Sequence, residues 1–234
     1  MPKFNLKLIE VIEESHDTKT FRFSTESIDL GLLPGQFVMA GTMIDGKLVR
    51  RAYSISSSPI EKRFIDLTIK KVENGLLSSY MCDKAKSGDI FAIEGPYGKF
   101  IYKDSNDPVI LMSAGCGIAP LMSILRYILG KKLQVHATLL HSCRTQNDML
   151  FKKELERLSE ANKNFKYIAT LTRENNNNWK GCIGRFDKNM IETVIKDKDN
   201  TQFFISGPVI FGHDIKKILE DIGIDKANVK EEVF

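Results

Sequence analysis

Cysteine is scarce in this sequence, and the four cysteines are far apart. They stand at positions 82, 116, 143 and 182 of 234 residues. Zinc and iron–sulfur sites use ligands at short, recurring spacings, and neither the cysteines nor the four histidines show such a spacing. The sequence therefore predicts no metal centre, and it predicts reduced thiols of the kind found in cytoplasmic proteins.

Long apolar segments without interruption are also missing. Residues 109–125 are uncharged, but this run is shorter than the roughly 20 residues of a membrane-spanning helix, and Gly115, Gly117 and Pro120 interrupt it. A buried strand, a glycine turn and the start of a helix fit this run better. Residues 1–17 meet several glutamates before an apolar run could form, which argues against a signal peptide. We expect a cytoplasmic protein with no membrane partner.

Neither sign of charge dominates the chain. The 34 basic and 30 acidic side chains give a formal net charge of +4, and both signs are spread over both halves of the sequence. Proteins that bind nucleic acid usually gather lysine and arginine in a tail or a stripe. We therefore expect no nucleic-acid partner.

What the first half does contain is a series of short segments that alternate polar and apolar residues. Such alternation predicts strands with one buried face, and Gly, Pro and Asp punctuate the segments at turns such as Leu33-Pro34-Gly35. The pattern predicts an antiparallel barrel or sandwich. The expected strands are residues 3–15, 18–25, 35–44, 48–57, 64–72 and 88–95, with one helix at residues 75–85.

After residues 102–108 the pattern changes to apolar runs that alternate with amphipathic segments. This is the rhythm of a parallel sheet covered by helices. The expected strands are residues 108–114, 133–141, 165–172 and 201–207, and the expected helices are residues 120–130, 148–161 and 211–223. The asparagine tract at residues 175–178 is expected to form an exposed loop. We place the domain boundary between residues 103 and 104.

A glycine-containing turn follows the first strand of the second half. Gly115 and Gly117 would let the backbone approach a pyrophosphate, and Pro120 suits the first turn of a helix whose free N–H groups face an anion. A tight turn without a ligand is the alternative. The motif departs from the common dinucleotide fingerprint, because Pro120 stands in place of a third glycine and the next strand runs into Ser142 rather than an acidic residue.

Three arginines follow strands or turns of the second half. Arg144, Arg173 and Arg185 are expected to gather at the carboxyl edge of the sheet, where their planar donors suit a 2′-phosphate. Solvated surface arginine is the alternative for each. The turn Ser206-Gly207-Pro208 is expected at the same edge, where open α/β sheets bind ligands.

Two features of the first half suggest a planar, phosphate-bearing ligand. Arg51 and Tyr53 share one face of a strand, so a cation and a flat aromatic ring line up as a flavin dinucleotide would require. Gly75 allows a turn, and Ser78 is expected to cap a short helix whose N–H groups face a phosphate. Ordinary barrel packing and helix capping without a ligand remain the alternatives.

Together these residues resemble the ferredoxin–NADP reductase superfamily. The segment 51–54 resembles its R-x-Y-S flavin motif, Gly75 with Ser78 its G-x-x-S phosphate loop, and residues 114–120 its nicotinamide-nucleotide loop. Ser206-Gly207-Pro208 resembles its C-G-P turn, and the closing EEVF resembles the family's final glutamate-x-aromatic. The five matches occur in family order and span nearly the whole chain.

The resemblance implies a two-domain fold: an antiparallel β-barrel FAD-binding domain, residues 1–103, followed by an α/β parallel-sheet NAD(P)-binding domain, residues 104–234. It implies FAD as cofactor and NAD(P)H as substrate, with NADPH favoured by the arginines. The implied catalytic residues are Ser54, Ser206, Glu232 and Phe234. The implied cofactor-binding residues are Arg51, Ala52, Tyr53, Ser54, Ile69, Lys70, Val72, Gly75, Leu77, Ser78, Gly115, Gly117, Ile118, Pro120, Ser142, Arg144, Arg173, Arg185, Gly207 and Pro208.

The activity that the resemblance implies is hydride transfer from NAD(P)H to FAD, followed by transfer of single electrons to a separate acceptor. Ferredoxin or flavodoxin is the first expectation, and an oxygenase or another multi-subunit redox complex is the second. Lys70, Lys71 and Lys99 could dock an acidic partner. A redox-inactive nucleotide sensor is a further alternative, because Ser206 replaces the usual cysteine. Cys116 stands where many members have glycine or threonine.

Overall fold

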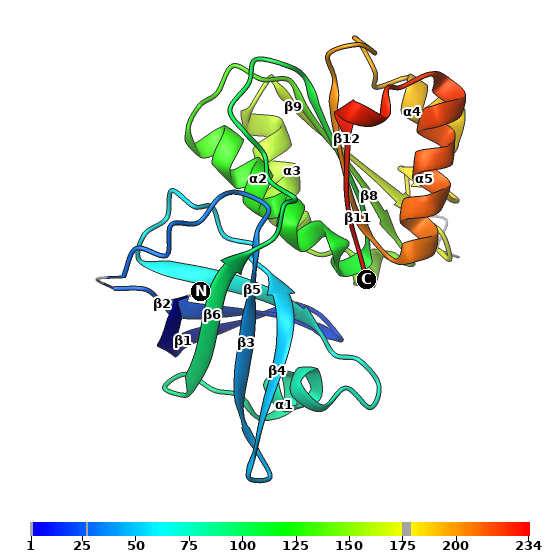
Figure 1. Ribbon diagram of the computed structural model, residues 1–234. Coiled ribbons are helices and arrows are strands. Elements are labelled where there is room, and N and C mark those ends of the chain that lie inside the picture. Colours follow the sequence, from blue (N-terminus) through cyan, green and yellow to red (C-terminus); the bar gives the residue numbers. More distant parts are fainter. Residues whose placement is uncertain (1, 27, 175–178) are drawn as a thin grey trace. The chain divides into compact units, whose positions relative to one another are not determined.

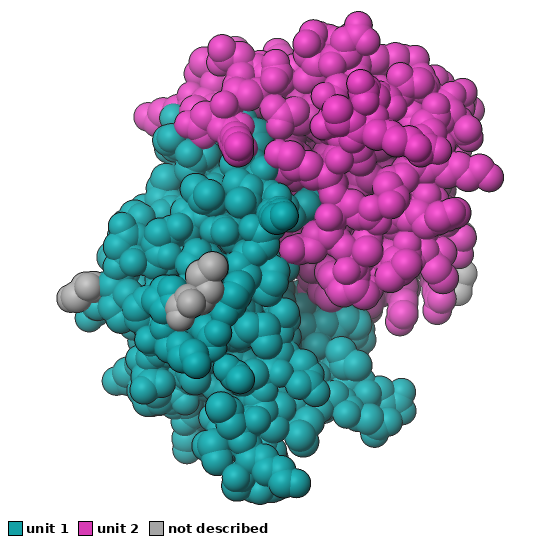
Figure 2. All heavy atoms as spheres, viewed as in Figure 1, with its two compact units in different colours: residues 1–102, 122–131 teal, residues 103–121, 132–234 magenta. Residues whose placement is uncertain are grey.

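The computed structural model describes residues 2–26, 28–174 and 179–234 (Figure 1). The loop expected at residues 175–178 lies outside the described residues. The chain forms two compact units (Figure 2). One unit comprises residues 1–102 and 122–131, and the other comprises residues 103–121 and 132–234.

The first unit is built on an antiparallel sheet that closes into a barrel. Its elements are β1 (Lys3–Ser15), β2 (Thr18–Ser24), β3 (Phe37–Ile44), β4 (Lys47–Ser54), β5 (Phe64–Lys70), α1 (Leu76–Lys84) and β6 (Ile90–Tyr97). The strand order is β4-β3-β6-β1-β2-β5, and every neighbouring pair is antiparallel. Ile55, directly after β4, forms an antiparallel bridge with Leu67 of β5, so the two ends of the sheet meet.

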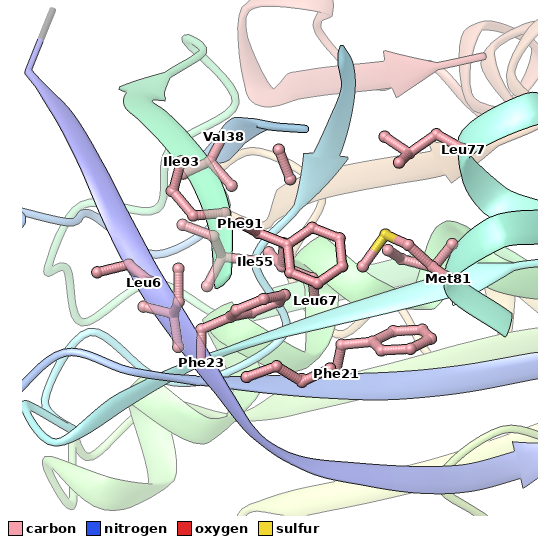
Figure 3. Packing of buried hydrophobic residues seen from close by; sticks show 14 of the residues in the cluster. Leu6, Phe21, Phe23, Val38, Ile55, Leu67, Leu77, Met81, Phe91 and Ile93 are labelled. Atoms are coloured by element: carbon pink, nitrogen blue, oxygen red, sulfur yellow. The ribbon is translucent and has the colours of Figure 1, made fainter. Parts of the chain in front are cut away.

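Apolar side chains at alternating strand positions fill the interior of this barrel (Figure 3). Phe23 of β2 meets Phe91 of β6 edge to face, with ring centroids 5.4 Å apart. Leu77 and Met81 lie four residues apart on one face of α1 and join the same core. Burial of each such side chain stabilises the fold by about 1.5–3 kcal/mol. The core thus holds α1 against the barrel.

The second unit is built on a parallel sheet covered by helices. Its elements are β7 (Val109–Ala114), η1 (Gly115–Gly117), the start of α2 (Ile118–Gly130), β8 (Ala137–Cys143), η2 (Gln146–Asp148), α3 (Lys152–Ala161), β9 (Phe165–Leu171), β10 (Cys182–Ile183), α4 (Lys188–Glu192), β11 (Gln202–Gly207), α5 (Val209–Ile222), η3 (Lys226–Asn228) and β12 (Val229–Val233). The rest of α2, from residue 122 onward, belongs to the barrel unit. The strand order is β10-β9-β8-β7-β11-β12, and every neighbouring pair is parallel. Apolar side chains of α4 and α5 pack on one cluster of sheet residues, and α3 packs against β9.

Hydrogen bonds of the chain segment after β4 explain two of the serines at residues 54–58, namely Ser56 and Ser57. The Asp66 N–H donates to Ser57 Oγ over 3.0 Å, and the Ser56 N–H donates to the Asp66 carbonyl over 2.9 Å. The Ser123 hydroxyl donates to the Ser57 carbonyl, and Arg126 Nη1 donates to the Ser56 carbonyl, each over 2.7 Å. Residues 122–131 belong to the barrel unit, so these contacts anchor the segment within that unit. Ser56 and Ser57 are therefore structural.

The predicted fold class, an antiparallel barrel followed by an α/β parallel-sheet domain, is confirmed. The sequence pattern did not predict β10, α4 or β12. Strand β12 consists of V-K-E-E-V, and its three charged residues exclude it from a search for apolar runs. Among the described strands it pairs with β11 alone, at the edge of the sheet. In the described part of the chain, no helix has the length and apolar character to cross a membrane.

Candidate functional site

The end of β4 places the arginine and tyrosine of the first motif side by side along one strand. Arg51 lies opposite Ala40 and Tyr53 opposite Val38, so the two share a face of the sheet as the alternation predicts. Tyr53 packs partly against the barrel core, and burial raises the pKa of its hydroxyl to about 12. Arg51 and Ala52 are exposed. The strand therefore presents a neutral aromatic ring next to an exposed cation.

The loop before α1 is held by Ser78, although not as a cap. The expectation that Ser78 caps the helix is wrong. The N-terminal cap residue is Gly75, so the helix has no side-chain cap bond. Ser78 is the third helical residue, and its hydroxyl turns back to accept from the Val72 N–H over 3.2 Å and donate to the Gly75 carbonyl over 3.3 Å. A Cβ at Gly75 would lie 2.5 Å from Ser78 Oγ, so only glycine leaves this arrangement undisturbed.

Helix α1 brings this loop to the same part of the barrel as the Arg51–Tyr53 strand. The helix packs against β3, β4 and β5. Its first-turn N–H groups have no partner within the helix, as in every α-helix, and no acidic residue lies in its first turn. The barrel unit thus combines free helical donors, an exposed cation and an aromatic face, which suits a ligand with phosphates and a flat ring.

Three other predicted cofactor residues lie elsewhere in the barrel. The Ile69 and Leu77 side chains are buried in the core. Lys70 forms an ion pair with Asp17, and the adjoining Lys71 pairs with Asp83 over 2.7 Å. These carboxylates reduce the positive field that the two lysines were expected to offer to an acidic partner. Lys99 is exposed.

In the second unit, the glycine loop and the Ser206-Gly207-Pro208 turn touch each other. Strands β7 and β11 are parallel neighbours, so both turns leave the sheet at its carboxyl edge. A Cβ at Gly117 would lie only 2.3 Å from the Ser206 carbonyl oxygen. Gly117 is thus required by the approach of another chain segment, whereas Gly115 supplies a positive φ of 53°. Close packing against the Ser206 backbone thus accounts for Gly117, and its expected role in the backbone approach to a pyrophosphate stays a prediction.

Strand β12 brings the carboxyl-terminal residues to the same edge. Glu232 pairs in register with Ser206, and Val233 pairs with Gly207. The Phe234 N–H donates to the Gly207 carbonyl over 3.2 Å, and the Phe234 side chain is exposed. Three of the predicted catalytic residues therefore meet at one turn. Ser54, the fourth, ends β4 in the barrel unit.

Ser206 is fully buried, and its hydroxyl finds no hydrogen-bond partner among the described residues. An unpaired buried hydroxyl normally costs about 1–3 kcal/mol. An unpaired hydroxyl at the meeting point of two turns calls for an explanation, such as an ordered water, local strain or a functional role.

His141 is a site residue that sequence reasoning missed. It ends an apolar stretch of β8, and its Nε2 lies 3.2 Å from the Gly115 carbonyl oxygen and 3.3 Å from Cys143 Sγ. Complete burial lowers the pKa of His141 to about 4. The neutral imidazole thus contacts the backbone of the glycine loop at the Gly115 carbonyl. The sequence did not predict this contact, because a single histidine in an apolar strand does not indicate which distant residue it will meet.

A cavity of about 190 Å³ opens at this carboxyl edge. Its walls come from the ends of successive strands and the first turns of α5. Arg185 lines it and pairs with Asp214 of α5 over 3.8 Å, a residue that the sequence did not single out. The lining residues are Ala114, Ser142, Thr172, Arg185, Phe186, Ile210, Phe211, Asp214 and Ile215.

The other two predicted arginines stand beside one another. The Arg173 N–H donates to the Arg144 carbonyl over 2.8 Å, which extends the pairing of β8 and β9 beyond their ends. Both side chains are exposed, and neither lines the cavity. Arg144 and Arg173 are therefore backbone neighbours. Arg185 differs from both of them because it lines the cavity.

The remaining predicted nucleotide residues belong to the start of α2 and the loop before it. Ile118 and Pro120 are buried in the first helical turn, Pro208 caps the start of α5, and Ser142 lines the cavity. Cys116 is partly exposed within η1. The thiols of Cys82 and Cys143 are held neutral, because burial raises their pKa to about 11 and about 12.

Two family matches cover most of the chain. Residues 5–102 match the oxidoreductase FAD-binding domain, and residues 111–217 match the oxidoreductase NAD-binding domain. The chain therefore belongs to the ferredoxin–NADP reductase superfamily of flavin-dependent NAD(P)H oxidoreductases.

Two named proteins are similar to this chain over nearly its whole length. It is 31% identical to the glycine betaine monooxygenase reductase subunit of Chromohalobacter salexigens over 99% of this chain and 64% of that protein. It is 32% identical to NADH-cytochrome b5 reductase 1 of Dictyostelium discoideum over 97% of this chain and 80% of that protein. The chain thus spans less than two thirds of the length of the monooxygenase reductase subunit.

A solved structure shows the same fold. The FAD/NAD-binding domain of nitric oxide dioxygenase from Vibrio cholerae superposes with a TM-score of 0.88 at 24% identity, covering 98% of each chain. At this identity the likeness concerns the fold.

Proposed function

We propose that this protein is an FAD-dependent reductase that takes reducing equivalents from NAD(P)H and passes electrons to a separate acceptor. The observation that carries the proposal is the convergence of the glycine loop, the Ser206-Gly207-Pro208 turn and β12 at one sheet edge that also contains a cavity. Residues 1–103 would bind FAD and residues 104–234 would bind NAD(P)H. FAD, when bound, supplies the coupling between two-electron and one-electron transfer.

The barrel residues fit an FAD site. Arg51 offers a permanent cation for the pyrophosphate, and the first turn of α1 offers N–H donors, which Gly75 and Ser78 keep accessible. Tyr53 offers a ring whose hydroxyl stays neutral, and Ser54 offers a hydroxyl at the end of the same strand. Together these groups would orient the cofactor within the barrel unit.

The sheet residues fit a nicotinamide nucleotide. Gly115, Ile118 and Pro120 would present the start of α2 to the pyrophosphate, while Ser142 and Arg185 line the adjacent cavity. The unpaired Ser206 hydroxyl would gain a partner from a bound ligand. Glu232, in register with Ser206, would place a carboxylate where positive charge develops on the substrate.

We propose NADPH as the preferred substrate, because Arg144 and Arg173 follow neighbouring strands, share a backbone hydrogen bond and expose both of their side chains at the sheet edge. The cytochrome b5 reductase relative carries NADH in its name, which supports the opposite preference. Initial rates with each nucleotide decide between the two. Arg144→Ala with Arg173→Ala should raise the KM for NADPH about tenfold or more and leave the KM for NADH nearly unchanged.

For the acceptor, ferredoxin or flavodoxin remains the first proposal. The component of an oxygenase is a second candidate, and the similarity to monooxygenase reductase subunits favours it. Protein reduced by NADPH under anaerobic conditions can be mixed with ferredoxin, flavodoxin or a Rieske-type oxygenase component. The acceptor reduced with the highest kcat/KM is then the functional one.

The experiment that tests the function begins with the visible spectrum of protein reconstituted with FAD. Flavin absorbance should bleach on anaerobic addition of NADPH or NADH and return with an artificial acceptor such as ferricyanide. Protein that binds nucleotide but never bleaches would support the redox-inactive sensor instead.

A matched pair of neighbouring arginines tests the FAD site itself. Arg51→Ala should weaken FAD binding by about 10- to 100-fold, the range expected for the loss of charge-assisted hydrogen bonds. Arg50→Ala serves as the control, because Arg50 is occupied by an ion pair with Glu94 at 3.0 Å. Equal FAD affinity of the two variants, measured by flavin fluorescence quenching, would contradict the assignment of Arg51.

A further inference from the structure

A second cavity, of about 180 Å³, lies at the opposite edge of the parallel sheet from the nucleotide residues. Val109, Ala137 and Phe165 line it, and each is the first residue of its strand. In a parallel sheet all such residues lie at the amino-terminal edge, whereas Ala114 and Gly207 end their strands at the other edge and Ser142 lies one residue before the end of β8. The cavity is therefore separate from the proposed NAD(P)H site.

The titratable side chains that line this cavity are all basic. They are His136, Lys163, Lys166 and Lys196, and no aspartate or glutamate is among the lining residues. None of the four side chains forms an ion pair or a hydrogen bond with a residue that the structure describes. With three lysines and no carboxylate in its lining, the cavity concentrates positive potential without internal compensation.

Lysines of the same unit differ in whether they pair with a carboxylate. Lys152, Lys216 and Lys226 pair with Glu156, Glu231 and Glu220, and Lys198 lies 4.0 Å from Glu192. Lys132, Lys153 and Lys217 are exposed and pair with no carboxylate that the structure describes. The lysines around the cavity belong to this second group, and they come from two separate chain segments, 163–166 and 196.

Two local explanations account for only part of the cluster. Lys163 follows the end of α3, where a cation favours the helix dipole. Asp197 adjoins Lys196 in sequence, but its carboxylate accepts from the Asn200 side chain over 2.9 Å and from the Asp199 N–H over 3.1 Å. Lys166, on β9, is at no helix end. These two explanations therefore do not account for the position of Lys166 beside the other two lysines.

Neutral polar residues and apolar residues complete the lining, and the apolar ones are Pro108, Val109, Ile110, Ala137, Phe165 and Val194. Thr138 of β8 and Asn164 lie among the lysines, and their side chains make no hydrogen bond with any described residue. A hydroxyl, an amide and three ammonium groups provide many donors around one small space. The volume exceeds what a single water requires and is below that of a site for a drug-sized ligand.

We propose that this cavity is a binding site for a small, multiply charged anion that carries a phosphate group or two to three carboxylates. The cations would act mainly through charge, because ammonium groups on flexible stems do not impose the planar geometry of arginine. The site is independent of FAD and NAD(P)H, so it stands whether or not the reductase proposal holds.

The test uses the full chain saturated with FAD and NADP⁺, so that phosphate cannot report on the nucleotide residues. Inorganic phosphate and citrate are titrated separately by calorimetry at constant ionic strength, which keeps screening equal. The variant Lys166→Ala with Lys196→Ala removes two cations from the cavity. The control, Lys7→Ala with Lys153→Ala, removes two exposed lysines that lie outside it and pair with no described residue.

We expect saturable binding of at least one of the two anions, weakened at least fivefold by the cavity variant and unchanged by the control. Tighter binding of phosphate would identify a phosphorylated ligand, and tighter binding of citrate a polycarboxylate. In the wild-type protein, the amide resonances of Thr138 and Asn164 should shift on titration. The absence of binding to the wild type, or equal loss in both double variants, overturns the proposal.

Discussion

His141 is a weak base enclosed in the sheet unit between the Gly115 carbonyl and the Cys143 thiol. Its pKa is lowered to about 4 from an ordinary 6.5, because burial opposes the charged form. Between these two pH values the unfolded chain binds a proton that the folded chain does not. Stability is therefore complete above about pH 6.5 and is lost as the pH falls toward 4, by up to about 3 kcal/mol.

Urea unfolding from pH 8 to pH 4.5 measures this loss. A His141→Gln variant should lose most of the pH dependence between pH 6.5 and 4.5, whereas His213→Gln, at an exposed histidine, should keep it. A wild-type free energy of unfolding that stays flat over this interval would contradict the neutral buried imidazole.

Ser206 offers a test in which stability and activity move in opposite directions. Its buried hydroxyl has no hydrogen-bond partner among the described residues, so Ser206→Ala should raise the free energy of unfolding by roughly 1 kcal/mol. If a bound nucleotide completes the hydroxyl, the same change should lower kcat/KM for NAD(P)H by about tenfold. Ser113→Ala is the control, because Ser113 is equally buried but already donates to the Leu140 carbonyl. Lower stability together with unchanged kinetics would contradict the assignment.

At the scale of elements, α1 and the loop before it act together through Ser78. Its hydroxyl connects the Val72 N–H to the Gly75 carbonyl, so Ser78→Ala should loosen the loop and weaken FAD binding by about fivefold to tenfold. The next residue provides the control: Ser79 is on the surface, and its hydroxyl reaches only the Val72 carbonyl at 3.4 Å. FAD titrations of both variants, with circular dichroism to confirm the fold, would refute this role if the two affinities agree.

At the scale of the whole molecule, each proposed ligand belongs to one compact unit. A ligand that binds only the folded state stabilises it, by about 2.7 kcal/mol at 100 times its dissociation constant. FAD should therefore raise the unfolding temperature of the apoprotein by several degrees, and Arg51→Ala should remove most of this shift at the same FAD concentration. Calorimetry of both proteins with and without FAD makes the measurement. An equal shift in the two would place the FAD site elsewhere.

The sequence by itself determined most of the strands and most of the helices. Alternation identified β1 at residues 3–15 with the bounds that the structure shows, and the helix predicted at residues 75–85 agrees with α1 to within one residue at each end. Such patterns are local: each strand must turn an apolar face toward a core, whatever lies beyond it. The motifs around Arg51, Gly75 and Gly115 could be recognised because each consists of residues close together in the sequence.

Only the tertiary structure decided which distant groups meet. The Ser206 backbone leaves no room for a side chain at Gly117, and His141 contacts the Gly115 carbonyl. The charged strand β12 is held by its pairing with β11. The basic cavity likewise unites residues from separate strand ends and loops. These contacts depend on strand order, because a parallel sheet gathers its strand ends at two edges, and strand order is not contained in any local pattern of residues.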